Sequence, residues 1–181
     1  MTDTLKYSLG ALTFIVVVFL FNQKKQSSHQ ISGQEIFSGQ RDDVYRIVIS
    51  EADQLVELVR NDSIWSLSNF DSMIVKENQV DKIFDKLLIV KEEMLITSKE
   101  EKWDKFGVDD SLGRHLKIYN SDDKELFHYI FGNSGQDYQH NFIRRHKSSN
   151  VHRTNDNVYF LLNSSVNYWA SKPKKLEIQN K

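Results

Sequence analysis

The residues with the clearest capacity for binding chemistry form a basic stretch in the last third of the chain. It consists of Arg144, Arg145, Lys147 and Arg153, with Phe142 and Tyr159 nearby. Cations beside exposed aromatic rings bind nucleic acids, but the chain has a net charge of −1 and contains no RNP-like or helix-turn-helix pattern. We therefore expect a binding patch for an acidic protein surface, an anionic glycan or lipid headgroups, and no nucleic acid. The alternative is a solvated strand edge that charge protects from aggregation.

Histidines are the second candidate group, because five of the six lie between residues 115 and 152. His140, His146 and His152 are spaced six residues apart, which is about 20 Å along a strand. Zinc ligands lie only about 2.0–2.1 Å from the metal, so these three cannot share one ion along a single strand. A cross-strand pair such as His115 with His128 remains open. No HExxH motif or His/Cys ligand cluster is present, and we predict packing or solvated histidines with no metal and no cofactor.

Nucleophilic and acid–base chemistry have weaker support in the sequence. The chain has no cysteine, no G-x-S-x-G elbow, no P-loop and no G-x-G-x-x-G motif. Four adjacent acidic pairs could act as acids or bases only if folding brought selected carboxylates into a cleft. They are Asp42-Asp43, Glu92-Glu93, Asp109-Asp110 and Asp122-Asp123. We predict that the protein is not an enzyme and identify no small-molecule substrate. The alternative is an envelope enzyme acting on glycan or peptide.

Composition and charge describe an ordinary globular domain with an uneven charge distribution. The 181 residues include 39% hydrophobic residues, enough for a core without metal or disulfides. Residues 41–110 carry ten bases and 17 acids, whereas residues 111–181 carry 11 bases and six acids. This polarity can orient an encounter with a charged partner, or it can reflect complementary packing of the two halves.

The N-terminus has the features of a membrane anchor. Leu9 to Phe21 is a run of thirteen uncharged residues, flanked by Lys6 and by Lys24-Lys25. Counted from Leu5, the helix would be about 26 Å long, just short of the ~30 Å hydrocarbon slab, and Lys6 can snorkel to close the gap. No small-residue cleavage site follows, which favours an uncleaved anchor over a secretory signal or a buried core helix. The two lysines favour a cytoplasmic body and the signal-like layout favours export, so orientation stays open.

We expect four segments along the chain. Residues 1–25 form the anchor with its flanks, 26–40 a polar linker, 41–172 a single α+β domain and 173–181 a basic C-terminal tail. Within the domain, apolar alternation predicts strands at 44–49, 55–60 and 64–67, the last two joined by a turn at 61–63. Four further strands are predicted at 114–119, 124–131, 141–145 and 158–162.

Two helices are predicted between these strand groups. Val80, Ile83, Phe84, Leu87 and Leu88 form one apolar stripe, with Asn78 as the cap. In the second helix, Ser98 and Glu101 are expected to form a capping box and Gly107 to end the helix in a left-handed conformation. The fold class is therefore α+β with a mainly antiparallel sheet, and the alternative is a β-sandwich with helical insertions. Trp65 and Trp103 are expected to face one core shared by the sheet and both helices.

The order of several short motifs resembles the bacterial domain of unknown function 4340 family. They are Leu58-Val59-Arg60 through Ile64-Trp65-Ser66-Leu67, Trp103-Asp104-Lys105-Phe106-Gly107-Val108, Ile130-Phe131-Gly132, Phe142-Ile143-Arg144 and Val158-Tyr159. Members often have an N-terminal membrane segment, and some accompany gliding-motility-type ABC transport systems. A tryptophan followed by arginine near the family's C-terminal end is here Trp169-Ala170, a departure from the pattern.

The resemblance implies a membrane-tethered extracytoplasmic module and brings no catalytic residues. We therefore expect a single-pass inner-membrane protein, held in the membrane by Leu9 to Phe21, whose soluble domain is extracytoplasmic. Its expected role is that of an interaction or accessory module with a protein partner in the envelope, serving a transport or envelope assembly. The alternatives are a cytoplasmic-facing domain and a secreted binding protein after signal cleavage.

Overall fold

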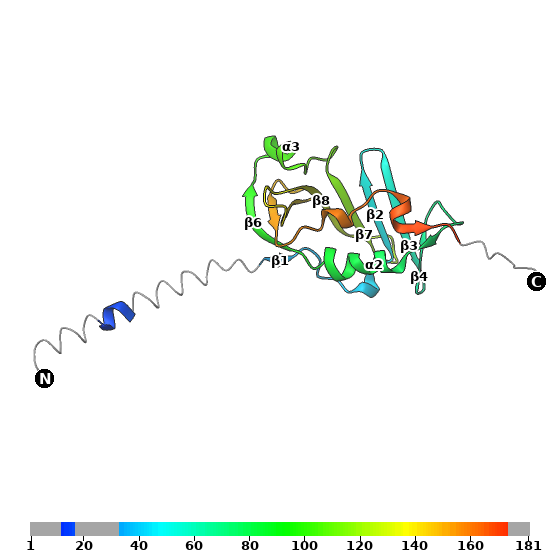
Figure 1. Cartoon of the computed structure of the whole chain (residues 1–181), viewed down its shortest axis with the longest axis horizontal. Helices are drawn as coiled ribbons and strands as arrows, with labels where there is room; N and C mark the ends of the chain where they lie inside the picture. Colours follow the sequence, from blue (N-terminus) through cyan, green and yellow to red (C-terminus); the bar gives the residue numbers. More distant parts are fainter. Residues whose placement is uncertain (1–11, 17–32, 174–181) are drawn as a thin grey trace, which may run out of the picture. The chain divides into compact units, whose positions relative to one another are not determined.

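The structure is a computed structural model that describes residues 12–16 and 33–173 (Figure 1). The chain divides into two units, residues 1–32 and 33–181. Residues 12–16 are helical, and the rest of the predicted anchor at Leu9 to Phe21 lies outside the described residues. Among the residues that are described, no helix combines the length and apolar character needed to cross a membrane. The basic tail is described only at residue 173.

The second unit is built on one nine-stranded antiparallel sheet in the order β1-β6-β10-β9-β8-β7-β2-β3-β4. Its strands are β1 (Gln34–Glu35), β2 (Arg46–Glu51), β3 (Gln54–Asn61), β4 (Ile64–Leu67), β6 (Lys91–Thr97), β7 (Arg114–Tyr119), β8 (Glu125–Ser134), β9 (Asn141–Arg145) and β10 (Val151–Thr154). A separate two-stranded sheet joins β5 (Ile74–Val75) to β11 (Ala170–Ser171). The predicted α+β class with a mainly antiparallel sheet is confirmed, and one continuous sheet replaces the sandwich alternative.

Apolar alternation places the main core on one face of the sheet. Ile47 pairs with Leu58 and Ile118, and Ile118 pairs with Phe127, so four strands direct their large side chains to the same side. Helical segments cover this face. Their buried side chains include Trp169, which is fully inaccessible to solvent.

The predicted apolar helix forms as two joined pieces, α2 (Glu77–Lys82) and a π-helical turn η2 (Ile83–Leu87). The stripe is confirmed, because Val80, Ile83, Leu87 and Leu88 are buried in the main core and Phe84 packs against it. The predicted cap is wrong: the helix begins at Glu77 after Lys76, so Asn78 lies inside the first turn.

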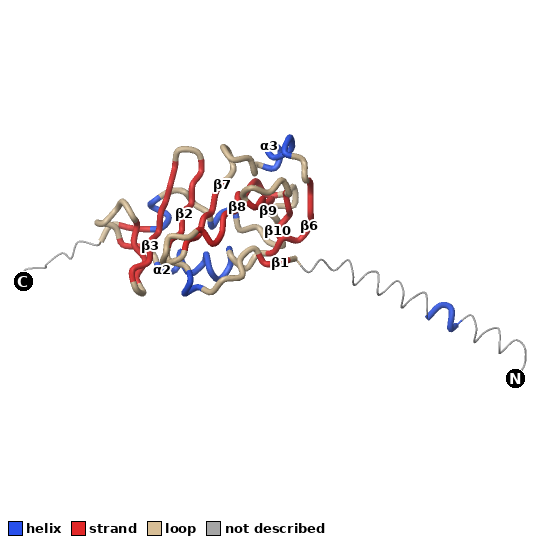
Figure 2. Tube along the Cα trace, turned by 180° about the vertical axis from the view of Figure 1, so that it is seen from behind, coloured by secondary structure: helices blue, strands red, loops and turns tan. Residues whose placement is uncertain are grey.

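The second predicted helix forms on the opposite face of the sheet as η3 (Glu100–Lys102) and α3 (Trp103–Phe106). Gly107 ends it with φ 64°, as predicted, but the capping box is wrong because Lys99 occupies the cap position without a side-chain bond. Figures 1 and 2 agree that α2 and α3 lie well apart on the domain. The single shared core is therefore wrong: Trp65 belongs to the main core, while Trp103 packs on a second cluster of Val108, Ile130 and Val151.

Several boundaries differ from the sequence predictions for identifiable reasons. The strand predicted at 158–162 is wrong: Tyr159–Leu161 form a 3-10 turn, η4, that begins where the Asn141 side chain accepts bonds from Val158 N and Tyr159 N. Strands β1, β5, β6, β10 and β11 were not predicted. In β6 the reason is clear, because it is exposed on both sides and shows no alternation. The remaining helix, α4 (Val166–Trp169), was also missed.

The domain begins earlier than residue 41. Ile36 is 5% exposed in the main core, and its backbone N–H donates to Val90 O at 3.0 Å. β1 pairs with β6, and η1 (Arg41–Asp43) follows it. The second half of the predicted linker is thus a folded part of the domain, and it forms one wall of the site described next.

Candidate functional site

The four cations of the predicted basic patch have different environments. Arg144 is buried at 1% exposure on the face of the sheet beneath α3, where its guanidinium lies 3.7 Å from the centre of the Trp103 ring. It donates to Val108 O at 2.9 Å and pairs with Asp110 at 2.5 Å. Arg144 is therefore a structural residue that connects β9 to the loop after α3, and it is not available to a partner.

The other three cations do not form one surface with it. Arg153 on β10 pairs with Glu93 of β6 at 2.7 Å, so its charge is matched within the sheet. Arg145 is exposed and donates through Nε to the Tyr129 hydroxyl at 2.9 Å. Lys147 is exposed just beyond the end of β9. Only Arg145 and Lys147 come together, at the rim of a cleft.

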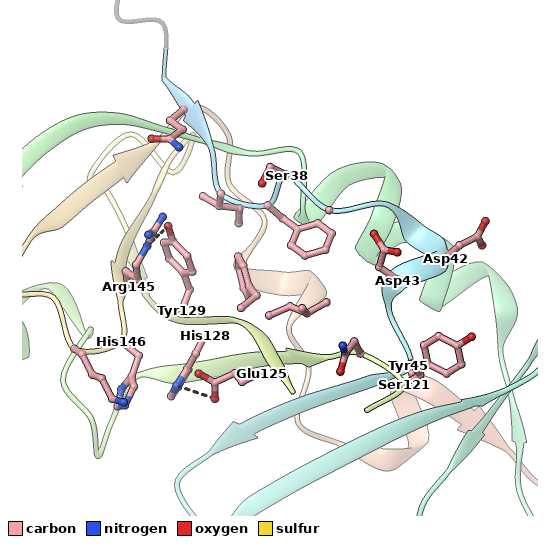
Figure 3. A pocket seen from close by; sticks show the side chains of 18 residues that line it. Ser38, Asp42, Asp43, Tyr45, Ser121, Glu125, His128, Tyr129, Arg145 and His146 are labelled. Atoms are coloured by element: carbon pink, nitrogen blue, oxygen red, sulfur yellow. Dashed lines mark hydrogen bonds and ion pairs between the residues drawn. The ribbon is translucent and has the colours of Figure 1, made fainter. Parts of the chain in front are cut away.

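This cleft has a volume of about 850 Å³ (Figure 3). One wall is the segment from Gln34 to Tyr45, and the other is the start of β8 with the end of β9. Sequence reasoning missed it because the two walls are about 80 residues apart in the chain. The available signal was the pair of apolar residues Ile36 and Phe37 within a polar stretch.

Aromatic rings line the interior of the cleft. Phe37 meets Phe127 edge-on at 5.9 Å between ring centres, and Phe127 stacks on Tyr129 at 4.6 Å. The Tyr129 hydroxyl donates to Glu92 at 2.8 Å. Burial and this bond to Glu92 raise the pKa of Tyr129 to about 12 against the opposing effect of Arg145, so the hydroxyl stays protonated at neutral pH.

The two ends of the cleft carry opposite charges. Asp42 and Asp43 lie at one end, and Arg145 and Lys147 lie at the other, with Glu125 between them. Figure 3 shows the labelled aspartates and Arg145 on opposite sides of the recess. The Asp42 side chain is 96% exposed and its carboxylate is 3.6 Å from Arg60. A charge gradient therefore runs along the cleft, and a ligand long enough to reach both ends would contact both charges.

Three histidines cluster where the cleft meets the sheet. His115 Nδ1 and His128 Nε2 are 2.9 Å apart, and the rings of His128 and His146 stack at 4.0 Å. His115 Nε2 donates to Asp110 O at 3.1 Å, so its Nδ1 must accept from His128 Nε2–H when both rings are neutral. The open cross-strand pair of His115 and His128 is thus a direct contact, and sequence reasoning did not anticipate His146 beside it.

Burial keeps His115 and His128 neutral. Burial first, and then the proximity of His146 and Lys117, lower the pKa of His128 to about 3. Burial also lowers the pKa of His115. His128 Nδ1 is 3.8 Å from Glu125, a separation that becomes an ion pair only on protonation. Within residues 12–16 and 33–173, no three His, Cys, Asp or Glu side chains are placed to hold a metal ion.

The acidic pairs take mainly structural positions. Asp109 accepts from Ser111 N and Leu112 N in a turn, and Glu93 pairs with Arg153. Asp123 pairs with Arg46 at the turn before β8. Of the four pairs, only Asp42-Asp43 lines the cleft. The cleft thus collects carboxylates, cations, a tyrosine and histidines, which can bind polar chain segments through charge and hydrogen bonds.

Comparison with known proteins gives one positive result. Neither the curated proteins nor the solved structures contain a match to this chain. Residues 65–174 match the family described as a domain of unknown function, DUF4340. The match runs from β4 to the C-terminal end of the domain, so it includes the β8 and β9 wall of the cleft and excludes the wall formed by residues 34–45. The chain belongs to the DUF4340 family.

Proposed function

We propose that this protein is a membrane-anchored, extracytoplasmic interaction module that serves an envelope assembly, such as a transport system. The observation that carries the proposal is the cleft, whose ends have opposite charges and whose interior is aromatic. A recess of this kind suits an extended polar segment of a partner.

The position of the cleft in the chain supports a role near the membrane. Its first wall begins at Gln34, and only residues 22–32 separate the apolar run ending at Phe21 from the domain. Eleven residues span at most about 40 Å when fully extended. An anchor at Leu9 to Phe21 would therefore keep the cleft near the bilayer, within reach of other membrane-bound components.

The test combines membrane extraction with a topology measurement on the full chain. Because the chain has no cysteine, Ser165→Cys introduces a single thiol at an exposed position of the domain. We expect the protein to stay in the membrane pellet after an alkaline carbonate wash, with its N-terminus intact. A membrane-impermeant maleimide should label the Cys variant in intact cells once the outer membrane is permeabilised. The cysteine-free parent chain is the matched control and gives the background signal.

Two outcomes would contradict the proposal. A soluble mature form starting near Ser28 would show a cleaved signal and a secreted binding protein. Labelling that requires lysis of the inner membrane would place the domain in the cytoplasm.

A further inference from the structure

Strand β8 is longer than its neighbour β9, and the difference leaves part of its edge uncovered inside the cleft. The β8–β9 ladder includes Tyr129 opposite Arg145. One further bond follows, from His146 N to His128 O at 3.0 Å. On its other side β8 pairs with β7 from Phe131 to Glu125. Residues 125–127 therefore have a strand neighbour on one side only.

The end of β9 explains why this edge stays open. Lys147 has φ 65°, a left-handed conformation that is uncommon outside glycine, and it turns the chain away from β8. Ser148 N then closes a turn on Arg145 O at 3.0 Å. A residue held in a sparsely populated conformation beside a cleft is a feature that clusters at ligand sites.

The free edge directs backbone groups into the cleft. The bond to His128 O shows that the backbone of His128 faces the β9 side. Leu126, two residues earlier, has no partner in the β7 ladder, because that ladder passes from Phe127 to Glu125. Among the described residues, no loop or turn makes a backbone bond to Leu126. A register shift opposite Ile118 and Tyr119 adds one residue to β8 here, a bulge of the kind that re-aims strands next to binding sites.

We propose that the cleft binds an extended segment of a partner protein, which adds to β8 as a short antiparallel strand beside residues 125–127. This inference rests on the proposed function and identifies the site and the chemistry of the partner. The backbone of Leu126 would supply hydrogen bonds that do not depend on sequence, and the charged ends would supply specificity.

Charge and direction together define the segment. A strand that continues the line of β9 enters near Arg145 and Lys147 and leaves near Asp42 and Asp43. It should therefore carry an acidic residue first and a basic residue at least four positions later, because Tyr129 and Glu125 are four residues apart. A parallel strand would require the reverse order.

The experiment selects displayed random nine-residue peptides on the full chain in detergent micelles at low salt. Two matched variants test the backbone contact: Leu126→Pro removes the N–H, whereas Leu126→Ala keeps it. Proline is tolerated at edges and bulges, so the strand should survive. We expect selected peptides to bind the alanine variant within about threefold of wild type and the proline variant at least about tenfold more weakly, because a hydrogen bond is lost in the cleft.

A charge exchange keeps the test valid if the proline variant fails to fold. Asp42→Lys with Lys147→Glu, both at exposed positions, cancels the charge at each end, because Asp43 and Arg145 keep theirs. The double variant should no longer prefer peptides in which the acidic residue comes first. Amide hydrogen exchange should also slow at residues 124–128 when peptide binds.

Several results would overturn the inference. One is that the selected peptides bind the proline and alanine variants with equal affinity. Another is that the double variant selects the same order of charged residues as wild type. A third is that peptide binding slows amide exchange at β6 residues 93–97 instead of at β8. The inference would also be overturned if no peptide were selected, or if the protein dimerised at high concentration and a second copy of the chain covered the β8 edge. None of these results affects membrane extraction or thiol labelling, so those two measurements test the proposed function independently of this inference.

Discussion

At the scale of single residues, Arg144 shows how one guanidinium can join two layers of the structure. It is enclosed by Trp103, Val108 and Asp110, and its pair with Asp110 is nearly removed from solvent on the arginine side. Breaking a buried pair by removing one partner is costly, because the remaining polar groups lose their hydrogen bonds. Adjacent Arg145 is exposed, although both residues appear equivalent in the sequence.

The two arginines should therefore respond differently to charge reversal. We expect Arg144→Glu to lower the free energy of unfolding by about 3–5 kcal/mol, since it also places a carboxylate near Asp110. Arg145→Glu should change it by less than about 1 kcal/mol, because that side chain is at the surface. Urea denaturation of the two variants measures the difference. Similar losses for both would show that Arg144 is not a structural residue.

His128 should make the domain sensitive to acid. Its folded pKa of about 3 lies below the ordinary value of 6.5, so the unfolded chain takes up the proton first as the pH falls. Its contribution to stability is complete above pH 6.5 and decreases between pH 6.5 and 3. Over about pH 7 to 4, this group alone should lower the free energy of unfolding by roughly 3 kcal/mol.

His128→Gln removes the titration while its amide can still donate to His115. We expect the stability of this variant to decline less steeply with acid than wild type, measured by urea denaturation at several pH values. Parallel curves for the two proteins would mean that His128 is protonated at the same pH in both the folded and unfolded states.

At the scale of elements, β8 carries contacts on both faces of the sheet and needs a glycine where α3 approaches. A Cβ built at Gly132 would lie 1.9 Å from Phe106 O and 2.7 Å from the Val108 side chain. Neither the backbone carbonyl nor the buried valine can move easily. Gly132 thus permits the close contact between β8 and the end of α3.

We predict that Gly132→Ala lowers the free energy of unfolding by about 1–3 kcal/mol through overpacking. Gly135→Ala is the matched control, because its added Cβ meets only the flexible end of Asp137 at 3.2 Å and the distant Phe142 ring. Thermal unfolding should show a lower melting temperature for the first variant and little change for the second. Equal melting temperatures would contradict the close contact.

How far the sequence predicts these elements depends on where their side chains lie. The strands of the main core and the stripe of α2 were predictable, because burial on one face imposes a period of two or about 3.6 on apolar residues. β6 was not, since it has Met94 and Leu95 exposed at the edge of the sheet and no alternating pattern. The strand expected at 158–162 failed because the Asn141 side chain holds the backbone there in a turn.

The candidate site was less predictable than the fold. Its residues come from two distant segments of the chain. The basic stretch was the strong signal in the sequence, but Arg144 is buried in a pair with Asp110, while Arg145 and Lys147 lie at the rim of the cleft. Adjacent Arg144 and Arg145 point to opposite faces of β9, a consequence of strand geometry that composition does not reveal. Membership of the family came from motif order, and the charge gradient of the cleft came only from the fold.

At the scale of the whole molecule, three features combine: an apolar N-terminal run, a domain that begins soon after it, and a cleft built by the first residues of that domain. Each half of the folded domain contributes one charged end of the cleft. Part of the excess of acids in residues 41–110 and of bases in residues 111–181 therefore forms a local charge gradient across the cleft.

Site-specific photo-crosslinking in living cells tests most directly whether the cleft is an interaction site. A photoreactive phenylalanine analogue replaces Leu126 in the cleft or, as a matched control, Leu55 on β3; these leucines are 40% and 53% exposed. If the cleft binds a partner, position 126 should give a discrete crosslinked protein, recovered in the membrane fraction, and position 55 should give none. The same adduct from both positions, or none from position 126, would contradict a role for the cleft in binding.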